Sequence, residues 1–374
     1  MAGSYKVGFV GYDSNSGLVP QYFDNVGDLA SATPVTVVAA SNRPGINAEL
    51  TDAAFPTPTP TATPTPTPTP APVVRLSGSD RFDTSAAISS ATFDPDVSVA
   101  YIANGSNFPD ALSTAPVAGK DKSPVLLVPA DSIPAPIQAE LARLKPKRIV
   151  VLGGANAVSD TVTAALQAYT SGAVTRAAGA DRFSTSVAIS AAGFDPAVPV
   201  AYIANGNNFP DALSAAPVAG KNGAPVLLVP SNGIPDVIQA ELTRLKPGRV
   251  VVLGGVNAVS DTTAAALKAY TAGAVTRVSG ADRFATSAAI SQATFDPAAP
   301  VVYVANAYNF PDALSGAPVA GLKGAPVLLV PSDSIPDVIQ AELTRLKPGR
   351  VVILGGPNAV ADAVAQQLNT FVTK

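Results

Sequence analysis

The chain has 374 residues and a formal charge of −3, and it contains neither cysteine nor histidine. These absences exclude disulfides, thiolate metal sites and the Ser-His-Asp triad, so we expect no ordinary hydrolytic catalysis, no metal and no cofactor. The excess acidic charge lies within residues 1–55 and the remainder is balanced, so no nucleic-acid partner is predicted, and no apolar run approaches the ~20 residues that would indicate a membrane partner.

Residues 1–55 differ from the rest of the chain. Apolar runs predict strands over Tyr5–Tyr12 and Val35–Ala39, with turn residues between them. Since so short a segment offers only a marginal core, we expect a small β-rich anchoring domain that completes itself on a protein assembly. A loosely ordered leader is the alternative. Residues 1–7 lack a basic region followed by an apolar core, so no secretory signal is predicted.

Residues 56–72 alternate threonine and proline almost without interruption. Proline fixes φ and removes backbone donors, which predicts an extended polyproline-II spacer. At about 3.1 Å per residue, this segment would hold its ends roughly 50 Å apart. A domain boundary without further consequence is the alternative, but a flexible Gly/Ser tether would serve that purpose as well. The composition therefore favours presentation of one domain at a distance from another.

The remaining chain consists of three near-identical repeats, 73–173, 174–274 and 275–374. The segment Asn-Phe-Pro-Asp-Ala-Leu-Ser marks them, beginning at Asn107, Asn208 and Asn309. In the first repeat, strands are predicted at residues 73–76, 99–103, 124–128 and 148–152, and helices at 81–91, 109–118, 133–144 and 157–169. This alternation predicts an α/β fold of three tandem doubly wound modules with mostly parallel sheets. Three equal units favour a closed pseudo-threefold ring, because then no end is left over.

The first candidate site is a glycine turn between two arginines six residues apart, Arg75 and Arg81 in the first repeat. Guanidinium groups hold phosphate or carboxylate through paired hydrogen bonds, and the helix N-terminus that Asp80 is expected to cap favours anions. Alternatively, the arginines pair with acidic residues and fix the repeats, and both roles stay open for different arginines. The equivalent residues are Arg176, Arg182, Arg277 and Arg283.

The second candidate is the Asn-Phe-Pro-Asp loop, whose amide and carboxylate beside an aromatic ring suit sugar hydroxyls. Alternatively, Asp110 caps its own helix and Phe108 fills the core, and for Phe108 the core role is favoured. In the third copy the preceding residues change to Ala307 and Tyr308, so we expect the third site to differ. The polar loop positions are Asn107, Asp110, Asn208, Asp211, Asn309 and Asp312.

The third candidate is a glycine pair after the fourth predicted strand of each repeat, at Gly153–Gly154, Gly254–Gly255 and Gly355–Gly356. Such pairs can cradle a phosphate between strand and helix. However, neither G-x-G-x-x-G nor the P-loop pattern occurs there. A tight turn is therefore the favoured interpretation.

These motifs together resemble the cell-wall-binding repeat 2 family. The resemblance rests on Arg-x-x-Gly-x-Asp-Arg-Phe-x-Thr-Ser, Asn-Phe-Pro-Asp-Ala-Leu-Ser, Pro-Val-Leu-Leu-Val and Leu-Gly-Gly-x-Asn-Ala-Val, which occur in all three copies across residues 73–374. It implies a pseudo-trimeric ring of Toprim-like modules that holds surface proteins non-covalently to anionic polymers of Gram-positive walls. It also implies that the six arginines are the chief polymer contacts. The absent export signal and residues 1–55 depart from the family's habit.

The leading hypothesis is a non-catalytic adhesion protein in which three weak sites gain avidity on an anionic cell-wall polysaccharide or teichoic-acid-like polymer. Because no secretory signal is predicted, we expect residues 1–55 to attach to a phage capsid or tail, which places the ring on a virion surface. A bacterial surface or S-layer type protein is the alternative location.

Two other classes of function stay open. A metal-dependent phosphoesterase is disfavoured, since Toprim-like catalysis needs clustered carboxylates and no Asp-x-Asp pair ends a predicted strand. A purely architectural ring that pads a capsid or surface lattice is the other.

Overall fold

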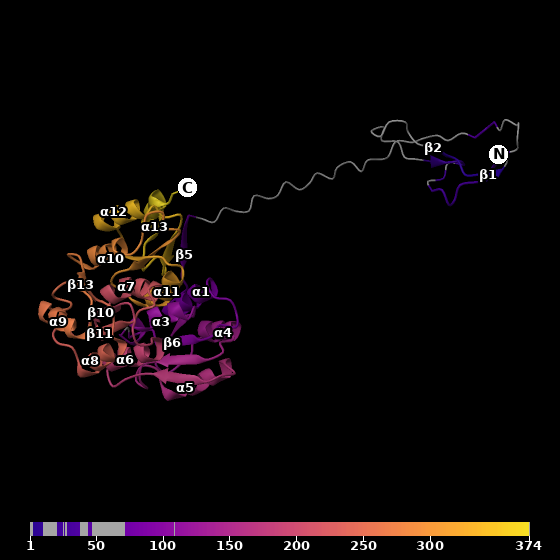
Figure 1. The fold of residues 1–374 in the computed structure, drawn as a ribbon. Coiled ribbons are helices and arrows are strands. Elements are labelled where there is room, and N and C mark those ends of the chain that lie inside the picture. The colour runs from indigo at the N-terminus through magenta and orange to yellow at the C-terminus, as the bar shows by residue number, and fades with distance from the viewer. Residues whose placement is uncertain are drawn as a thin grey trace. The chain divides into compact units, whose positions relative to one another are not determined.

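The computed structural model describes residues 3–9, 21–24, 26, 28–37, 44–46, 72–107 and 109–373. The chain divides into two compact units, Met1–Pro70 and Ala71–Lys374 (Figure 1). No helix in the described ranges is long and apolar enough to cross a membrane. Residues 56–71, which make up nearly all of the predicted spacer, lie outside the described residues.

The described strands of the first unit form two small antiparallel sheets. One pairs β1 (Gly3–Tyr5) with β4 (Val35–Val37), and the other pairs β2 (Gly8–Phe9) with β3 (Gln21–Tyr22). The strand predicted over Tyr5–Tyr12 is thus interrupted after Tyr5, and its residues 10–12 lie outside the described part, as do residues 38 and 39.

The second unit contains three four-stranded parallel sheets with the same strand order, β7-β6-β8-β9, β11-β10-β12-β13 and β15-β14-β16-β5. Three of the four strands of each sheet are short, buried and mainly apolar runs, as expected where both faces of a sheet are covered, whereas the last strand in each order, at the edge of the sheet, carries an arginine and is partly buried. The first sheet is built from β6 (Ala100–Asn104), β7 (Val125–Val128), β8 (Ile149–Leu152) and β9 (Val174–Ala177). The second is built from β10 (Ala201–Asn205), β11 (Val226–Val229), β12 (Val250–Leu253) and β13 (Val275–Val278). The third is built from β14 (Val302–Asn306), β15 (Val327–Val330), β16 (Val351–Leu354) and β5 (Val73–Leu76).

Each sheet crosses a repeat boundary. The first strand of the second repeat, β9, pairs with β8 of the first, and β13 pairs with β12 in the same way. The strand β5 pairs with β16 in register from Val73 with Val351 to Leu76 with Leu354, so the start of repeat 1 completes the sheet of repeat 3. The sequence order predicts that each sheet is made from the four strands of one repeat, and this prediction is therefore wrong. Because the first strand of each repeat joins the sheet of the preceding repeat, the pairing of β5 with β16 closes the predicted ring.

The helices lie close to their predicted positions. Repeat 1 holds α1 (Arg81–Ser90), α2 (Pro109–Leu112), α3 (Thr114–Lys120), α4 (Ala135–Leu144), α5 (Asp160–Ala165) and the 3-10 helix η1 (Leu166–Tyr169). Repeat 2 holds α6 (Arg182–Gly193), α7 (Pro210–Lys221), α8 (Asp236–Leu245), α9 (Asp261–Ala266) and η2 (Leu267–Tyr270). Repeat 3 holds α10 (Arg283–Gln292), α11 (Pro311–Leu322), α12 (Asp337–Leu346), α13 (Asp362–Leu368) and η3 (Asn369–Phe371).

The fourth helix of the repeat begins later than predicted. Ser159 accepts a hydrogen bond from the Val162 amide and so caps α5, which moves the start from residue 157 to Asp160. The preceding residues 153–158 are thereby left as a loop after β8, and this loop contributes to the site described below.

The central helices α3, α7 and α11 contact one another and join the three repeats (Figure 1). Where they meet, Ala115, Ala216 and Ala317 form a separate buried cluster, exposed by 2%, 1% and 0%. A Cβ placed on Gly119 would lie 3.3 Å from the Pro318 carbonyl oxygen. The alanine and glycine residues at these positions therefore allow the backbones of α3, α7 and α11 to approach closely.

Replacing Ala317 by Leu should destabilise the ring by about 1–3 kcal/mol, because an already filled contact between three helices must accept extra methylenes. Thermal unfolding measures the change. Ala265→Leu on the exposed face of α9 is the matched control and should unfold near the wild-type temperature. Equal melting temperatures for both variants would contradict this account of the central contact.

Candidate functional site

Three equivalent pockets lie where one repeat meets the next, and we name each by its two repeats. Pocket 1–2 and pocket 3–1 have volumes of about 360 Å³, and pocket 2–3 has about 510 Å³. In each sheet the pocket lies beyond the carboxyl ends of the strands, between β6 and β8 or their equivalents. The strand order reverses there, which is the usual place for a ligand site in open α/β sheets.

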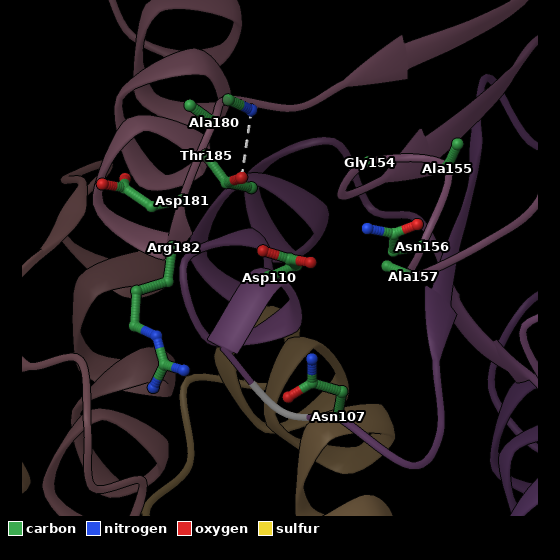
Figure 2. A pocket seen from close by; sticks show the side chains of 11 residues that line it. Asn107, Asp110, Gly154, Ala155, Asn156, Ala157, Ala180, Asp181, Arg182 and Thr185 are labelled. Atoms are coloured by element: carbon green, nitrogen blue, oxygen red, sulfur yellow. Dashed lines mark hydrogen bonds between the residues drawn. The ribbon is translucent and has the colours of Figure 1, made fainter.

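Each pocket combines side chains that the sequence placed in separate candidate sites. Asn107 and Asp110 of repeat 1 line pocket 1–2 together with Arg182 of repeat 2. Figure 2 shows the Asp110 carboxylate between Arg182 on one side and Asn156 on the other. Asn208 and Asp211 line pocket 2–3 with Arg283, and Asn309 and Asp312 line pocket 3–1 with Arg81.

The pocket carboxylates are desolvated. Burial raises the pKa of Asp110, while the Thr185 hydroxyl and the Arg182 guanidinium oppose the rise. In the other two pockets burial raises the pKa of Asp211 and Asp312 to about 6, against the opposing charge of an arginine. Burial therefore outweighs the arginine's charge, and these groups take up protons within the weakly acidic range.

These carboxylates do not cap their own helices in the second and third repeats. The N-cap positions of α7 and α11 are Phe209 and Phe310, and no side chain caps either helix. Asp110 is likewise the second residue of α2, after Pro109. Each carboxylate instead lies against the glycine turn that follows β8, β12 or β16.

The glycine pairs form tight turns, as favoured from the sequence. The first glycine of each pair has a positive φ, +83° at Gly153, +85° at Gly254 and +97° at Gly355. A Cβ at Gly153 would also collide with the Asp110 Oδ2 atom. The turn thus needs glycine both for its backbone conformation and for the approach of the carboxylate.

The second arginine of each motif stands at the first residue of a helix whose preceding aspartate caps it. Asp80 accepts hydrogen bonds from the Phe82 and Asp83 amides, so the predicted cap is confirmed. The Nη1 atom of each of these arginines donates to a backbone carbonyl oxygen of its own repeat, at N···O distances of 2.8, 2.8 and 2.9 Å. Within the described ranges none of the three forms an ion pair. They are Arg81, Arg182 and Arg283.

The first arginine of each motif is engaged within the ring. The Nη1 atom of Arg176 donates to the Gly153 carbonyl at 2.7 Å, and its Nη2 lies 3.0 Å from an Asp160 carboxylate oxygen. Arg75 and Arg277 make the same two kinds of contact with the preceding repeat in the ring. These contacts correspond to the structural alternative, and these three arginines do not line the pockets.

The comparison with known proteins matches this arrangement of repeats. The family described as Cell wall binding domain 2 (CWB2) matches residues 75–163, 176–264 and 277–365. The chain belongs to this family.

Two curated proteins are similar to this chain. N-acetylmuramoyl-L-alanine amidase LytC of Bacillus subtilis (strain 168) is 28% identical over 300 residues, covering 80% of this chain and 58% of LytC. The Amidase enhancer of the same organism is 32% identical over 156 residues, covering 41% of this chain and 21% of that protein. This chain thus spans little more than half of LytC, and about a fifth of the Amidase enhancer.

Two solved structures have the same fold. Cwp6 from Clostridium difficile superposes with a TM-score of 0.76 at 27% identity, covering 81% of this chain and 48% of Cwp6. Cwp8 from the same organism gives 0.73 at 26% identity, covering 80% of this chain and 52% of Cwp8. The three parallel-sheet modules are therefore shared with these proteins.

Sequence reasoning missed an asparagine at the end of the second strand of each CWB2 repeat. The Asn104 amide donates to the Ala157 carbonyl, and its Oδ1 accepts from the Ser106 amide at 2.6 Å. It therefore ties together the two loops that line pocket 1–2, and its equivalents do the same in the other pockets. The recurrence of Asn after each apolar run was a signal, but alone it indicates a turn. The equivalents are Asn205 and Asn306.

The loop aromatics have a mixed outcome. Phe108 lies outside the described residues. Phe209 and Phe310 are partly buried against the core, and their ring centroids lie 5.7 Å apart in an edge-to-face arrangement. At these two positions the core role favoured for this loop aromatic is observed.

Proposed function

We propose that the ring binds anionic cell-wall polymers of Gram-positive bacteria without catalysis, through its three inter-repeat pockets. The observation that carries this proposal is the pocket arginine, which has no ion pair in the described structure and retains guanidinium hydrogens beyond the one given to a carbonyl. Guanidinium groups bind phosphate and carboxylate through paired hydrogen bonds. Asparagine amides from the flanking loops supply further donors and acceptors for polymer hydroxyls.

Three such sites on one rigid ring suit a repetitive ligand. Once one pocket holds a polymer, the other two pockets are exposed to the same polymer molecule at a high effective concentration. Modest affinities of the single sites therefore combine into tight overall binding. The fixed spacing of the three pockets would then select polymers long enough to reach more than one of them.

The proposal extends to how the ring is displayed. Membership in the CWB2 family supports a location at the cell wall or surface. We further propose that residues 1–55 attach the ring to a protein assembly through the Thr/Pro spacer. A phage capsid or tail would give a virion-surface location, and a bacterial surface lattice is the alternative. Labelling the native source with antibodies against residues 73–374 would distinguish virions from bacterial envelopes.

Co-sedimentation of the full chain with purified Gram-positive walls tests the binding proposal. We expect the protein to pellet with intact walls, to be released by added salt, and to stay in solution with walls stripped of phosphodiester-linked polymers by mild acid. Equal pelleting with stripped walls would identify peptidoglycan as the ligand and refute recognition of the anionic polymer. Failure to pellet with any wall would favour a purely architectural ring.

A further inference from the structure

Pocket 2–3 differs from the other two pockets in the large exposed apolar side chains at and near its lining. Val256, which lines it, is 53% exposed, and Tyr308, which contacts the lining residue Arg283, is 61% exposed. The position of Val256 is occupied by Ala155 in repeat 1 and Pro357 in repeat 3. Repeats that otherwise agree closely thus diverge at the entrance of one pocket.

The Tyr308 ring is held in a defined place. The guanidinium carbon of Arg283 lies 4.8 Å from the Tyr308 ring centroid, and the Phe284 ring packs edge-on at 6.0 Å. The Tyr308 amide also donates to Asn306 Oδ1 at 2.7 Å. An aromatic ring fixed on two sides loses little conformational freedom when a ligand covers its remaining surface.

The equivalent positions in the other repeats are polar. Asn207 occupies this place in repeat 2, where its Oδ1 accepts from Arg182 Nη1 at 3.3 Å, and Ser106 occupies it in repeat 1. The repeats therefore offer three different neighbours for an otherwise constant arginine.

We propose that Tyr308, stacked on the Arg283 that lines pocket 2–3, forms a sugar-stacking subsite at the edge of this pocket. A pyranose ring presents a face of C–H bonds that packs on an aromatic surface, while its hydroxyls stay available to polar groups. The neighbouring Arg283 pairs with a phosphate or carboxylate carried by the same polymer. The preferred ligand of this pocket is a glycan repeat with a hexose next to an anionic group. This inference rests on the proposed binding function and specifies its substrate class.

Tyr308 could serve either to position Arg283 or to stack against a sugar ring. Two variants separate these two roles. Tyr308→Asn recreates the repeat 2 arrangement, with a polar neighbour for the arginine and no ring. Tyr308→Phe keeps the ring and removes only the hydroxyl. If stacking is the role, Tyr308→Asn loses affinity and Tyr308→Phe keeps it.

Two anionic polymers serve as probes for the full chain, polyphosphate without sugar and the hexose-containing anionic polysaccharide released from Gram-positive walls. We expect Tyr308→Asn to weaken polysaccharide binding by about three- to tenfold, which is the range for an aromatic contact, and to leave polyphosphate binding unchanged. Equal losses for both polymers would show that Tyr308 only positions Arg283, and no loss for either would also overturn the subsite.

A direct readout comes from Tyr308→Trp, because the chain has no tryptophan of its own. Its emission should shift on addition of the polysaccharide and stay constant with polyphosphate. Binding shown by sedimentation without an emission shift would overturn the subsite while leaving the proposed function intact. The absence of binding by wild-type protein to either polymer or to walls would remove both.

Discussion

Replacing Arg81, Arg182 and Arg283 together by Gln should abolish retention of the protein on Gram-positive walls. Each arginine is the cation of one pocket, and a charge-assisted hydrogen bond contributes about 1.5–3 kcal/mol, so each single replacement should weaken one site by roughly 10- to 100-fold. The triple variant also loses the avidity of three linked sites. Co-sedimentation with purified walls measures the loss, and far-UV circular dichroism verifies that the α/β ring is still folded.

The arginines that precede them in each motif provide the contrast. Arg75, Arg176 and Arg277 bridge the first strand of one repeat to the glycine turn of its neighbour, with side chains only about one-fifth exposed. Replacing one of them by Gln should lower the melting temperature and leave wall binding unaltered at temperatures where the variant is folded. Loss of binding at an unchanged melting temperature would reverse the assignment of the two arginine sets.

The pocket carboxylates Asp211 and Asp312 should contribute a loss of stability to the ring as the pH rises from about 4 to 7. Burial raises the folded-state pKa of Asp211 and Asp312 to about 6, above their ordinary value of 3.8. Because the folded chain binds these protons more tightly than the unfolded chain, their stabilising effect is complete below pH 4 and is lost as the pH passes 6. A change of about two pKa units corresponds to about 3 kcal/mol for each group.

Urea unfolding between pH 4 and pH 8 measures this dependence through its difference from a variant. The double variant Asp211→Asn, Asp312→Asn should be more stable than the wild type at pH 7 and should lack this fall in stability across pH 4–7. Asp131→Asn, at an exposed position, is the matched control and should follow the wild-type curve. A double variant less stable than the wild type at pH 7 would mean that the ionised carboxylates stabilise the ring.

Much of the local structure could be predicted from the sequence, because local physics determines it. The apolar runs predicted the strands, the aspartate before Arg81 predicted a cap, and the paired glycines predicted a turn that requires a positive φ. The assignment of strands to sheets could not be predicted in this way. Val73–Leu76 has the same apolar character whichever sheet it joins, and its partner, β16, lies at the other end of the chain.

The same limit applied to the site. The sequence predicted the loop residues and the arginines as separate candidate sites, and it could not show which repeats supply the residues of one pocket. Ring closure instead brings Asp110 to Arg182 and Asp312 to Arg81. The burial of these carboxylates could not be predicted from the sequence either, because an aspartate in the first turn of a helix usually faces water. The change at Tyr308 was noticed, but only the structure shows that its ring contacts Arg283, which lines pocket 2–3, not pocket 3–1.

The strand β5 determines how a mechanical pull would enter the molecule. The chain reaches the ring at Pro72 and passes directly into Val73–Leu76, and residues 78–81, just beyond, line pocket 3–1. Any tension between the N-terminal segment and a wall-bound ring therefore acts first on the backbone hydrogen bonds between β5 and β16. The four residues of β5 separate the N-terminal segment from the residues that line pocket 3–1, so separation of β5 from β16 would open the ring at this pocket.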